Sequence, residues 1–137
     1  MRDHQDAAPE VLDRLRERCL ALPEAYEERA WVGTRWCVRR KTFAHVAPVV
    51  DGWPPAFAKV AGTDGPCTIL VFRAEGDDLE MLANAGPPFL HAGWGRDAIG
   101  LFLDDDTDWD EVTELLTESY CTMAPGKLAA LVDRPET

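Results

Sequence analysis

The hydrophobic pattern of this 137-residue chain changes its period twice, and the order of these changes restricts the fold. Apolar residues follow helical spacing over residues 9–22, form short runs between turn signals over residues 35–103, and return to helical spacing after residue 108. A parallel sheet would need crossover helices between its strands, and the middle of the chain shows no regular series of them. One helix, several strands and then helices predict an α+β fold with an antiparallel β-sheet.

Apolar spacing, prolines and turn residues predict where the helices and strands begin and end. The first helix carries an apolar stripe and stops at Pro23; the stripe consists of Leu12, Leu15, Cys19 and Leu22. The elements expected next are strands within 35–50 with a turn or charged edge at Arg39-Arg40-Lys41, a weak strand at 56–61, a turn at 62–66, a buried central strand at 67–72, a short helix at 77–83 and a last strand at 99–103.

The C-terminal part carries the clearest signals. Asp108 and Glu111 fit a capping box that opens a helix, and Pro125 starts a second, shorter one. The first of these helices is expected to bury the face formed by Trp109, Val112, Leu116 and Tyr120.

Length and composition predict one domain. The chain is 46% hydrophobic and 28% charged, close to the average of soluble globular proteins. No apolar run approaches the ~20 residues that a membrane helix needs, and the N-terminus lacks the pattern of a signal peptide. We expect a flexible N-terminus over residues 1–8, one domain over 9–132 and a C-terminal tail over 133–137, in a cytoplasmic monomer or weak dimer without membrane contact.

The net charge of −11 arises from 14 basic and 25 acidic residues that are unevenly distributed. Residues 74–118 contain thirteen acids and one arginine, whereas residues 29–45 contain five basic residues and no acid. An acidic molecule repels nucleic acid at long range, so contact with phosphates would have to use the basic segment. The candidate residues there for binding nucleic acid or another anion are Arg35, Arg39, Arg40 and Lys41, with Trp31 and Trp36 beside them for stacking. The alternative is a charged strand edge that prevents aggregation, with the tryptophans in the core.

A second hypothesis places an aromatic pocket near residues 89–94. The candidate lining residues are Trp36, His45, Phe89, His91 and Trp94. The spacing allows His45 to share the strand face of Phe43, two residues earlier. A module of this kind would bind a small molecule or a protein and would be indifferent to DNA.

Catalytic motifs are absent from the sequence, which favours a non-enzymatic protein without a cofactor. The only serine, Ser119, falls inside the long C-terminal helix, which argues against a Ser-His-Asp hydrolase. The GTDG segment at 62–65 lacks the ending of a phosphate-binding loop. The alternative is an unrecognised enzyme that uses His45, His91 or a cysteine, for example a Cys67–His91 pair.

The acidic run at 104–111 and the four cysteines do not predict a metal site. No register of the run places Gly and Glu as an EF-hand requires, and carboxylates at a helix start are explained by capping. The cysteines contain no Cys-x-x-Cys pair, so we expect buried small side chains at Cys19, Cys37, Cys67 and Cys121. A weak cation site and a reactive thiol are the alternatives.

Several segments of the chain resemble the MmcQ/YjbR family of small bacterial proteins. They are Gly93-Trp94-Gly95, the strand IGLFLD, the helix DWDEVTELLTESY and APGKLAAL in the C-terminal half, and CLALPEAYEE and KTFAHV near the start. The resemblance covers about residues 11–132. It implies a frataxin/CyaY-like fold, in which a curved antiparallel sheet is packed on one face by the N- and C-terminal helices.

The same resemblance implies a DNA-binding protein with a double-wing arrangement and no agreed catalytic residues. In the family, basic residues often follow the Ala-Pro segment, which adds Lys127 to the candidate anion-binding residues. The nucleic-acid hypothesis predicts that Arg39, Arg40 and Lys41 lie exposed together on one surface.

Overall fold

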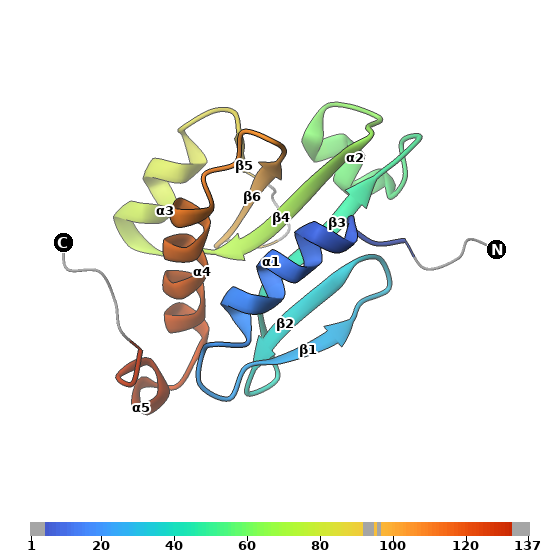
Figure 1. Cartoon of the computed structure of the whole chain (residues 1–137). Coiled ribbons are helices and arrows are strands. Elements are labelled where there is room, and N and C mark those ends of the chain that lie inside the picture. Colours follow the sequence, from blue (N-terminus) through green and yellow to red (C-terminus); the bar gives the residue numbers. More distant parts are fainter. Residues whose placement is uncertain (1–4, 92–94, 96, 133–137) are drawn as a thin grey trace.

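The described part of the chain forms one open sheet of six antiparallel strands (Figure 1). The structure is a computed structural model that describes residues 5–91, 95 and 97–132. The strands are β1 (Tyr26–Arg29), β2 (Thr34–Val38), β3 (Lys41–Val49), β4 (Cys67–Arg73), β5 (Phe89–His91) and β6 (Ala98–Leu103). Their order across the sheet is β1-β2-β3-β4-β6-β5, which puts the apolar strand β4 in the interior as expected.

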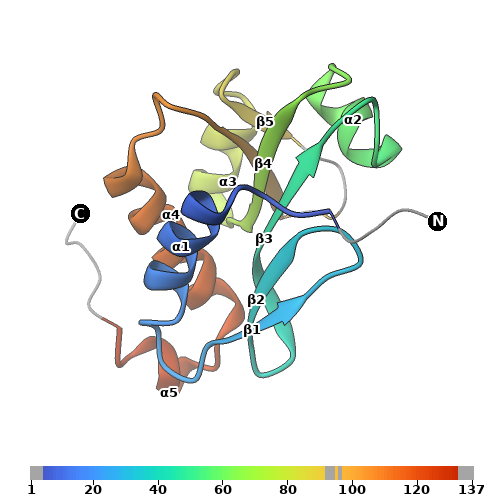
Figure 2. The same ribbon diagram turned by 45° about the vertical axis from the view of Figure 1, so that its right-hand side comes forward.

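The helices that begin and end the fold lie on the same face of this sheet. The described residues form α1 (Pro9–Cys19), α2 (Pro55–Ala61), α3 (Gly76–Ala83), α4 (Trp109–Met123) and α5 (Gly126–Ala129). Helices α1 and α4 contact each other and cross the sheet side by side (Figures 1 and 2). The prediction of an α+β fold with N- and C-terminal helices on one face is therefore confirmed.

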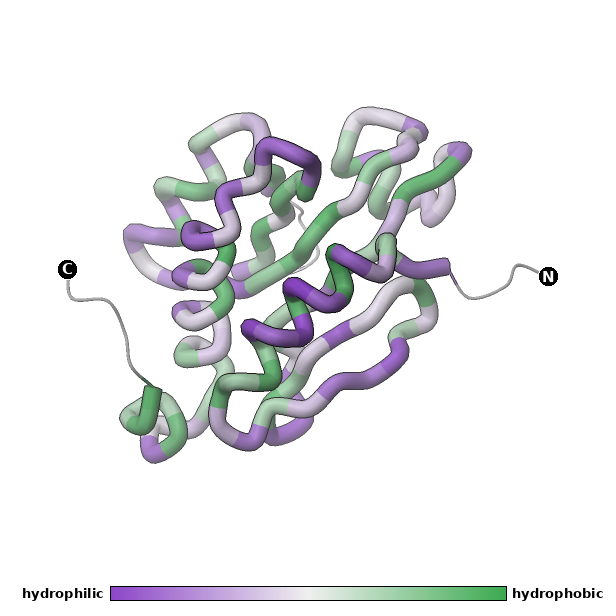
Figure 3. The backbone as a smooth tube through the Cα atoms, viewed as in Figure 1, coloured by the Kyte–Doolittle hydropathy of each residue, from purple (hydrophilic) through white to green (hydrophobic). Residues whose placement is uncertain are grey.

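The main core fills the space between α1, α4 and the sheet. Its largest fully buried side chains include Trp36, Tyr120, Phe43 and Phe72. Along the tube in Figure 3 the central strands are mostly hydrophobic, whereas α1 alternates between hydrophobic and hydrophilic residues. Such alternation is typical of a helix that buries one side and exposes the other. None of the helices in the described residues is long and apolar enough to cross a membrane.

The cap expected at Asp108 is confirmed, whereas the first helix ends at Cys19, before the expected stop at Pro23. The side chain of Asp108 caps α4 by accepting hydrogen bonds from the backbone N–H groups of Asp110 and Glu111. The acidic run therefore has a structural role at the helix start.

Cys19 and Cys37 are buried, and Cys67 and Cys121 are partly buried. Burial raises the pKa of the Cys19, Cys37 and Cys67 thiols, so these side chains stay protonated.

The hairpin turn between β2 and β3 lies at the expected place. Arg39 and Arg40 form it, with φ angles of 49° and 68°. Two successive residues with positive φ match a two-residue hairpin turn, whose twist fits that of the flanking strands. The turn holds the basic side chains of Arg39, Arg40 and Lys41 in solvent.

The strand predicted at 56–61 is wrong, because these residues belong to helix α2. Pro55 fits the first position of a helix, and Gly62 ends it in the left-handed conformation with its N–H bonded to the carbonyl of Ala58. The alanine-rich segment between them lacks the alternation of a strand. Helix α2 packs Phe57 and Ala58 against the sheet face opposite α1 and α4, where they meet Ile69.

Candidate ligand-binding site

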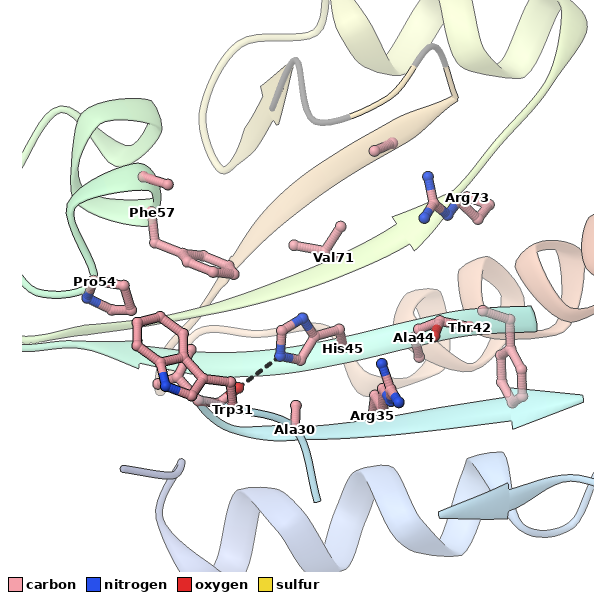
Figure 4. A pocket seen from close by; sticks show the side chains of 14 residues that line it. Ala30, Trp31, Arg35, Thr42, Ala44, His45, Pro54, Phe57, Val71 and Arg73 are labelled. Carbon is pink, nitrogen blue, oxygen red and sulfur yellow. Dashed lines mark hydrogen bonds between the residues drawn. The ribbon is translucent and has the colours of Figure 1, made fainter. Parts of the chain in front are cut away.

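The sheet face opposite α1 and α4 carries a pocket of about 440 Å³ (Figure 4). Side chains and backbone from the β1–β2 connection, β2, β3, the α2 region, β4 and the start of β6 line it. The lining residues are Ala30, Trp31, Val32, Arg35, Thr42, Phe43, Ala44, His45, Pro54, Ala56, Phe57, Val71, Arg73 and Ala98. Helix α2 forms one end of the pocket, so the site depends on an element that sequence patterning did not predict.

Strand register explains why three of these side chains meet. Arg35 on β2 lies opposite His45 on β3, and His45 lies opposite Val71 on β4. Residues that are direct partners across neighbouring strands point to the same face, so the three form a row across the pocket floor. Arg73 follows Val71 by two residues and therefore extends the same face.

The pocket has an aromatic end and a cationic end, as Figure 4 shows. Trp31 and Phe57 stand at the end formed by α2, and 79% of the Trp31 surface is exposed. The Trp31 ring packs edge-on against Trp53, with 5.3 Å between ring centroids. Arg73 stands at the other end, and Arg35 lies beside His45. A ligand in this site would meet flat apolar surface on one side and guanidinium groups on the other.

His45 occupies the middle of the floor as a neutral imidazole. Its Nε2 lies 2.7 Å from the backbone oxygen of Val32. A carbonyl oxygen only accepts, so Nε2 carries the proton, and Nδ1 of the neutral ring is an acceptor. Burial and the nearby charge of Arg35 lower the pKa of His45, against the opposing effects of the Val32 hydrogen bond and Asp6. The Phe57 ring meets the imidazole edge-on, at 5.7 Å between centroids.

The two arginines are each held by a carboxylate that does not line the pocket. Nη2 of Arg35 lies 3.2 Å from Glu28 Oε1, and Nη1 of Arg73 donates to Asp97 Oδ1 at 2.9 Å. A guanidinium has five N–H donors, so each arginine keeps donors for a ligand. The described lining contains two arginines and no carboxylate, in a chain whose net charge is −11. Glu28 and Asp97 offset part of the arginines' charge from outside the lining, so the pocket itself presents guanidinium groups without a carboxylate among its described lining residues.

The structure separates the side chains that the sequence suggested for one pocket. His45 lines the pocket, but Trp36 is fully buried in the core, where its Nε1 donates to Glu27 Oε1 at 3.0 Å. Phe89 packs on the opposite, helix-covered side of the sheet, and strand alternation directs the exposed His91 the same way. Trp94 lies outside the described residues.

The candidate anion-binding residues also fall into two groups. Arg35 belongs to the pocket, whereas Arg39, Arg40 and Lys41 lie exposed together at the β2–β3 turn. Arg39 forms an ion pair with Glu24 at 2.9 Å. Hydrogen bonding from Arg39, together with the more distant charge of Lys127, lowers the pKa of Glu24. Glu24 thus interacts with the charges of both Arg39 and Lys127 and offsets part of them.

Arg73 and Phe57 are pocket residues that the sequence did not suggest. Arg73 directly follows the predicted central strand, and alternation from Val71 would have placed it on the same face. Phe57 could be found only by recognising the segment 55–61 as a helix, from Pro55 and Gly62.

The described residues also show how possible metal ligands and the serine are placed. Within residues 5–91, 95 and 97–132, no three His, Cys, Asp or Glu side chains are placed to hold a metal ion. Ser119 is fully buried and bonded to the backbone of β3 and β4. Its hydroxyl therefore lies in the interior, away from the pocket.

Stability should fall when the pH drops below the ordinary pKa of histidine, and His45 should cause part of this fall. The pKa of His45 in the folded chain lies below the ordinary histidine value of 6.5, so the unfolded chain takes up a proton that the folded chain resists. The contribution of His45 is complete above that value and is lost as the pH falls toward the folded pKa. We expect the urea midpoint of the wild type to fall more between about pH 7.5 and about pH 5.5 than that of His45→Gln. Parallel pH profiles of the two proteins would contradict the partly buried, neutral state of His45.

One of the comparisons with known proteins finds a match to this chain. The model of the YjbR family matches residues 20–122, which include β1 to β6 and nearly all of α4. No curated protein and no solved structure matches the chain, so kinship to CyaY stays a prediction. The match spans well over half of the sequence. The chain belongs to the YjbR family.

Proposed function

We propose that this YjbR-family chain is a binding protein that holds a small molecule in the pocket on the open face of its sheet. One observation carries the proposal: six separate segments contribute to one concave, largely apolar site that also holds Arg35, His45 and Arg73. Small-molecule sites are typically apolar concavities with a few polar groups that fix orientation. The volume of about 440 Å³ falls within the usual range of such sites.

Ligand capture can be tested with a neutral fluorescent probe, phenylnaphthylamine, titrated into the full chain. The wild type should enhance its fluorescence in a saturable manner. Val71→Trp should abolish this enhancement, because Val71 lies half-buried on the pocket floor and an indole there would occupy the site. Aromatic residues are well tolerated in strands, so the variant is expected to fold.

Met81→Trp is the matched control, because Met81 lies on α3 with 63% of its surface exposed and does not line the pocket. It should bind the probe as the wild type does. Equal binding by Val71→Trp and wild type, with both shown to be folded by circular dichroism, would contradict the proposal.

A second candidate function is contact with nucleic acid through the β2–β3 turn. The observation that favours it is the joint exposure of Arg39, Arg40 and Lys41 at that turn. Basic side chains on a projecting hairpin suit phosphate contact. The ion pair between Arg39 and Glu24 and the overall negative charge oppose it.

This candidate predicts that labelled duplex DNA binds the wild type in fluorescence anisotropy and that binding weakens steeply with salt. The triple variant Arg39→Asn/Arg40→Gly/Lys41→Gln should lose this binding. It should not lose stability, because Asn-Gly suits two turn positions with positive φ better than two arginines do. Val71→Trp, which changes only the pocket, should bind DNA like the wild type. Absence of binding at low salt, or unchanged binding by the triple variant, would exclude this function.

A further inference from the structure

We infer that the pocket selects an amphipathic anion: a small molecule with a flat apolar body and one acidic group. The body would lie against Trp31 and Phe57, and the acidic group would meet Arg35 and Arg73. This inference rests on the proposed function of the pocket and adds the class of ligand. The arginines at one end of the pocket support the acidic group, and the aromatic rings at the other end support the flat apolar body.

The cationic end of the pocket, formed by Arg35 and Arg73, differs from the acidic molecule in its composition. The chain contains 25 acidic residues, yet the described pocket lining contains no carboxylate. Arg35 and Arg73 come from strands separated by β3, and both reach the same concavity (Figure 4). Guanidinium groups match carboxylates and phosphates by paired N–H donors, which a point charge such as lysine does not provide.

Arg73 is held in place before any ligand binds. Its backbone N–H donates to Ser119 Oγ at 2.7 Å, and its Nη1 donates to Asp97 at 2.9 Å. A Cβ at position 95 would lie 3.2 Å from Nη1, so Gly95 leaves the guanidinium the room it occupies. An ordered side chain loses less conformational entropy on binding than a free one. Arg73 is therefore suited to bind an anionic ligand while it keeps its ion pair with Asp97.

The aromatic end gives the ligand body its shape. Trp31 is largely exposed and Phe57 lies against His45, so both present ring surface to the pocket. Aromatic rings bury large flat surfaces at low entropic cost and pair well with planar groups. The ligand body is accordingly planar and apolar, and it lies across Val71 between the rings and the arginines (Figure 4).

Two probes with the same aromatic scaffold test the inference. Anilinonaphthalene sulfonate carries an anionic group, and phenylnaphthylamine is its uncharged counterpart; both have the same secondary amine. With the full wild-type chain, we expect the sulfonate to bind with a Kd about tenfold or more below that of the neutral probe. The double variant Arg35→Gln/Arg73→Gln should reduce the ratio of the two Kd values, neutral probe over sulfonate, to about threefold or less.

Two further variants separate charge from folding. Arg35→Lys/Arg73→Lys keeps both positive charges. The ratio of the two Kd values for this variant should therefore stay above that for the glutamine variant. Arg14→Gln/Lys59→Gln makes the same change of net charge at exposed positions outside the pocket and outside the β2–β3 turn, and it should keep the wild-type ratio of the two Kd values. Circular dichroism and urea unfolding establish that each variant folds.

The acidic group of the ligand could be a carboxylate or a phosphate, and competition distinguishes them. Naphthoate and naphthyl phosphate are titrated against bound anilinonaphthalene sulfonate, with naphthol as the uncharged reference. Both acids should displace the probe at lower concentration than naphthol, and the stronger of the two identifies the preferred group. Displacement by naphthol at equal concentration would overturn the inference.

The outcomes also distinguish this inference from the proposed function. Equal affinity for the two probes, with Val71→Trp abolishing both, would overturn the choice of an anion and leave the pocket as a binding site. No saturable binding of either probe would overturn the pocket function and the inference together.

Discussion

Gly33→Ala should leave little folded protein, with a loss of about 4 kcal/mol or more in the free energy of unfolding. Gly33 has a φ of +76°, and a Cβ there would lie 1.8 Å from the backbone oxygen of Val46. The clash is with the backbone of a central strand, which cannot move aside as a flexible side chain could. Gly33 also ties the β1–β2 connection to the N-terminal segment, because its N–H donates to the backbone oxygen of Gln5 at 2.7 Å.

Gly86→Ala provides the matched control for this substitution. Gly86 has nearly the same φ, +77°, but a Cβ there would have no atom within 4 Å. Its replacement should cost only the left-handed backbone penalty of about 1–2 kcal/mol. Urea unfolding followed by circular dichroism compares the two. Equal losses would show that the close packing of the β1–β2 connection on β3 is not what requires glycine at position 33.

Ser119→Ala is expected to have the second-largest effect, a loss of about 2–4 kcal/mol in the free energy of unfolding. The hydroxyl donates to the backbone oxygen of Phe43 at 2.5 Å and accepts from the backbone N–H of Arg73 at 2.7 Å. Alanine would leave one carbonyl and one N–H without this partner at a fully buried position. Leaving buried polar groups unsatisfied costs more than the hydrogen bonds themselves contribute.

The control for this prediction lies on the same helix. The hydroxyl of Thr117 donates to the backbone oxygen of Thr113, one turn earlier, and Thr117 is only half-buried. Thr117→Ala should change the unfolding free energy by about 0.5 kcal/mol or less. A Ser119→Ala variant as stable as Thr117→Ala in urea would contradict the bridging role of Ser119. A folded Ser119→Ala protein should also bind anilinonaphthalene sulfonate more weakly, because Ser119 fixes the backbone of Arg73.

Much of the fold follows from the sequence, because its helical segments and turns are marked by local chemistry. Asp108 and Pro125 mark the starts of the C-terminal helices, and the Arg39–Arg40 turn falls between two alternating segments. Helix α2 was missed because a seven-residue alanine-rich segment carries too little periodicity to separate helix from strand. Its proline and glycine ends were the informative signal.

The site was harder to predict because it depends on which face of each strand is covered. Arg35 and His45 were both suggested, but for different sites, and only the register of β2 and β3 brings them together. A register shift between Trp36 and Cys37 also interrupts the alternation of β3, so both Phe43 and Ala44 face the core. The expectation that His45 shares the face of Phe43 is therefore wrong. Local spacing does not reveal such an irregularity, which arises from pairing between strands.

Chemical-shift mapping by NMR tests the central claim most directly, with anilinonaphthalene sulfonate titrated into the full chain. The account predicts that the largest changes in backbone-amide shift cluster around the pocket, at Trp31, Arg35, His45, Val71 and Arg73. It also predicts that the indole N–H of the exposed Trp31 shifts, while that of the buried Trp36 does not. Changes concentrated at the β2–β3 turn or at β5, with the pocket residues unmoved, would contradict the assignment of this face of the sheet as the binding site.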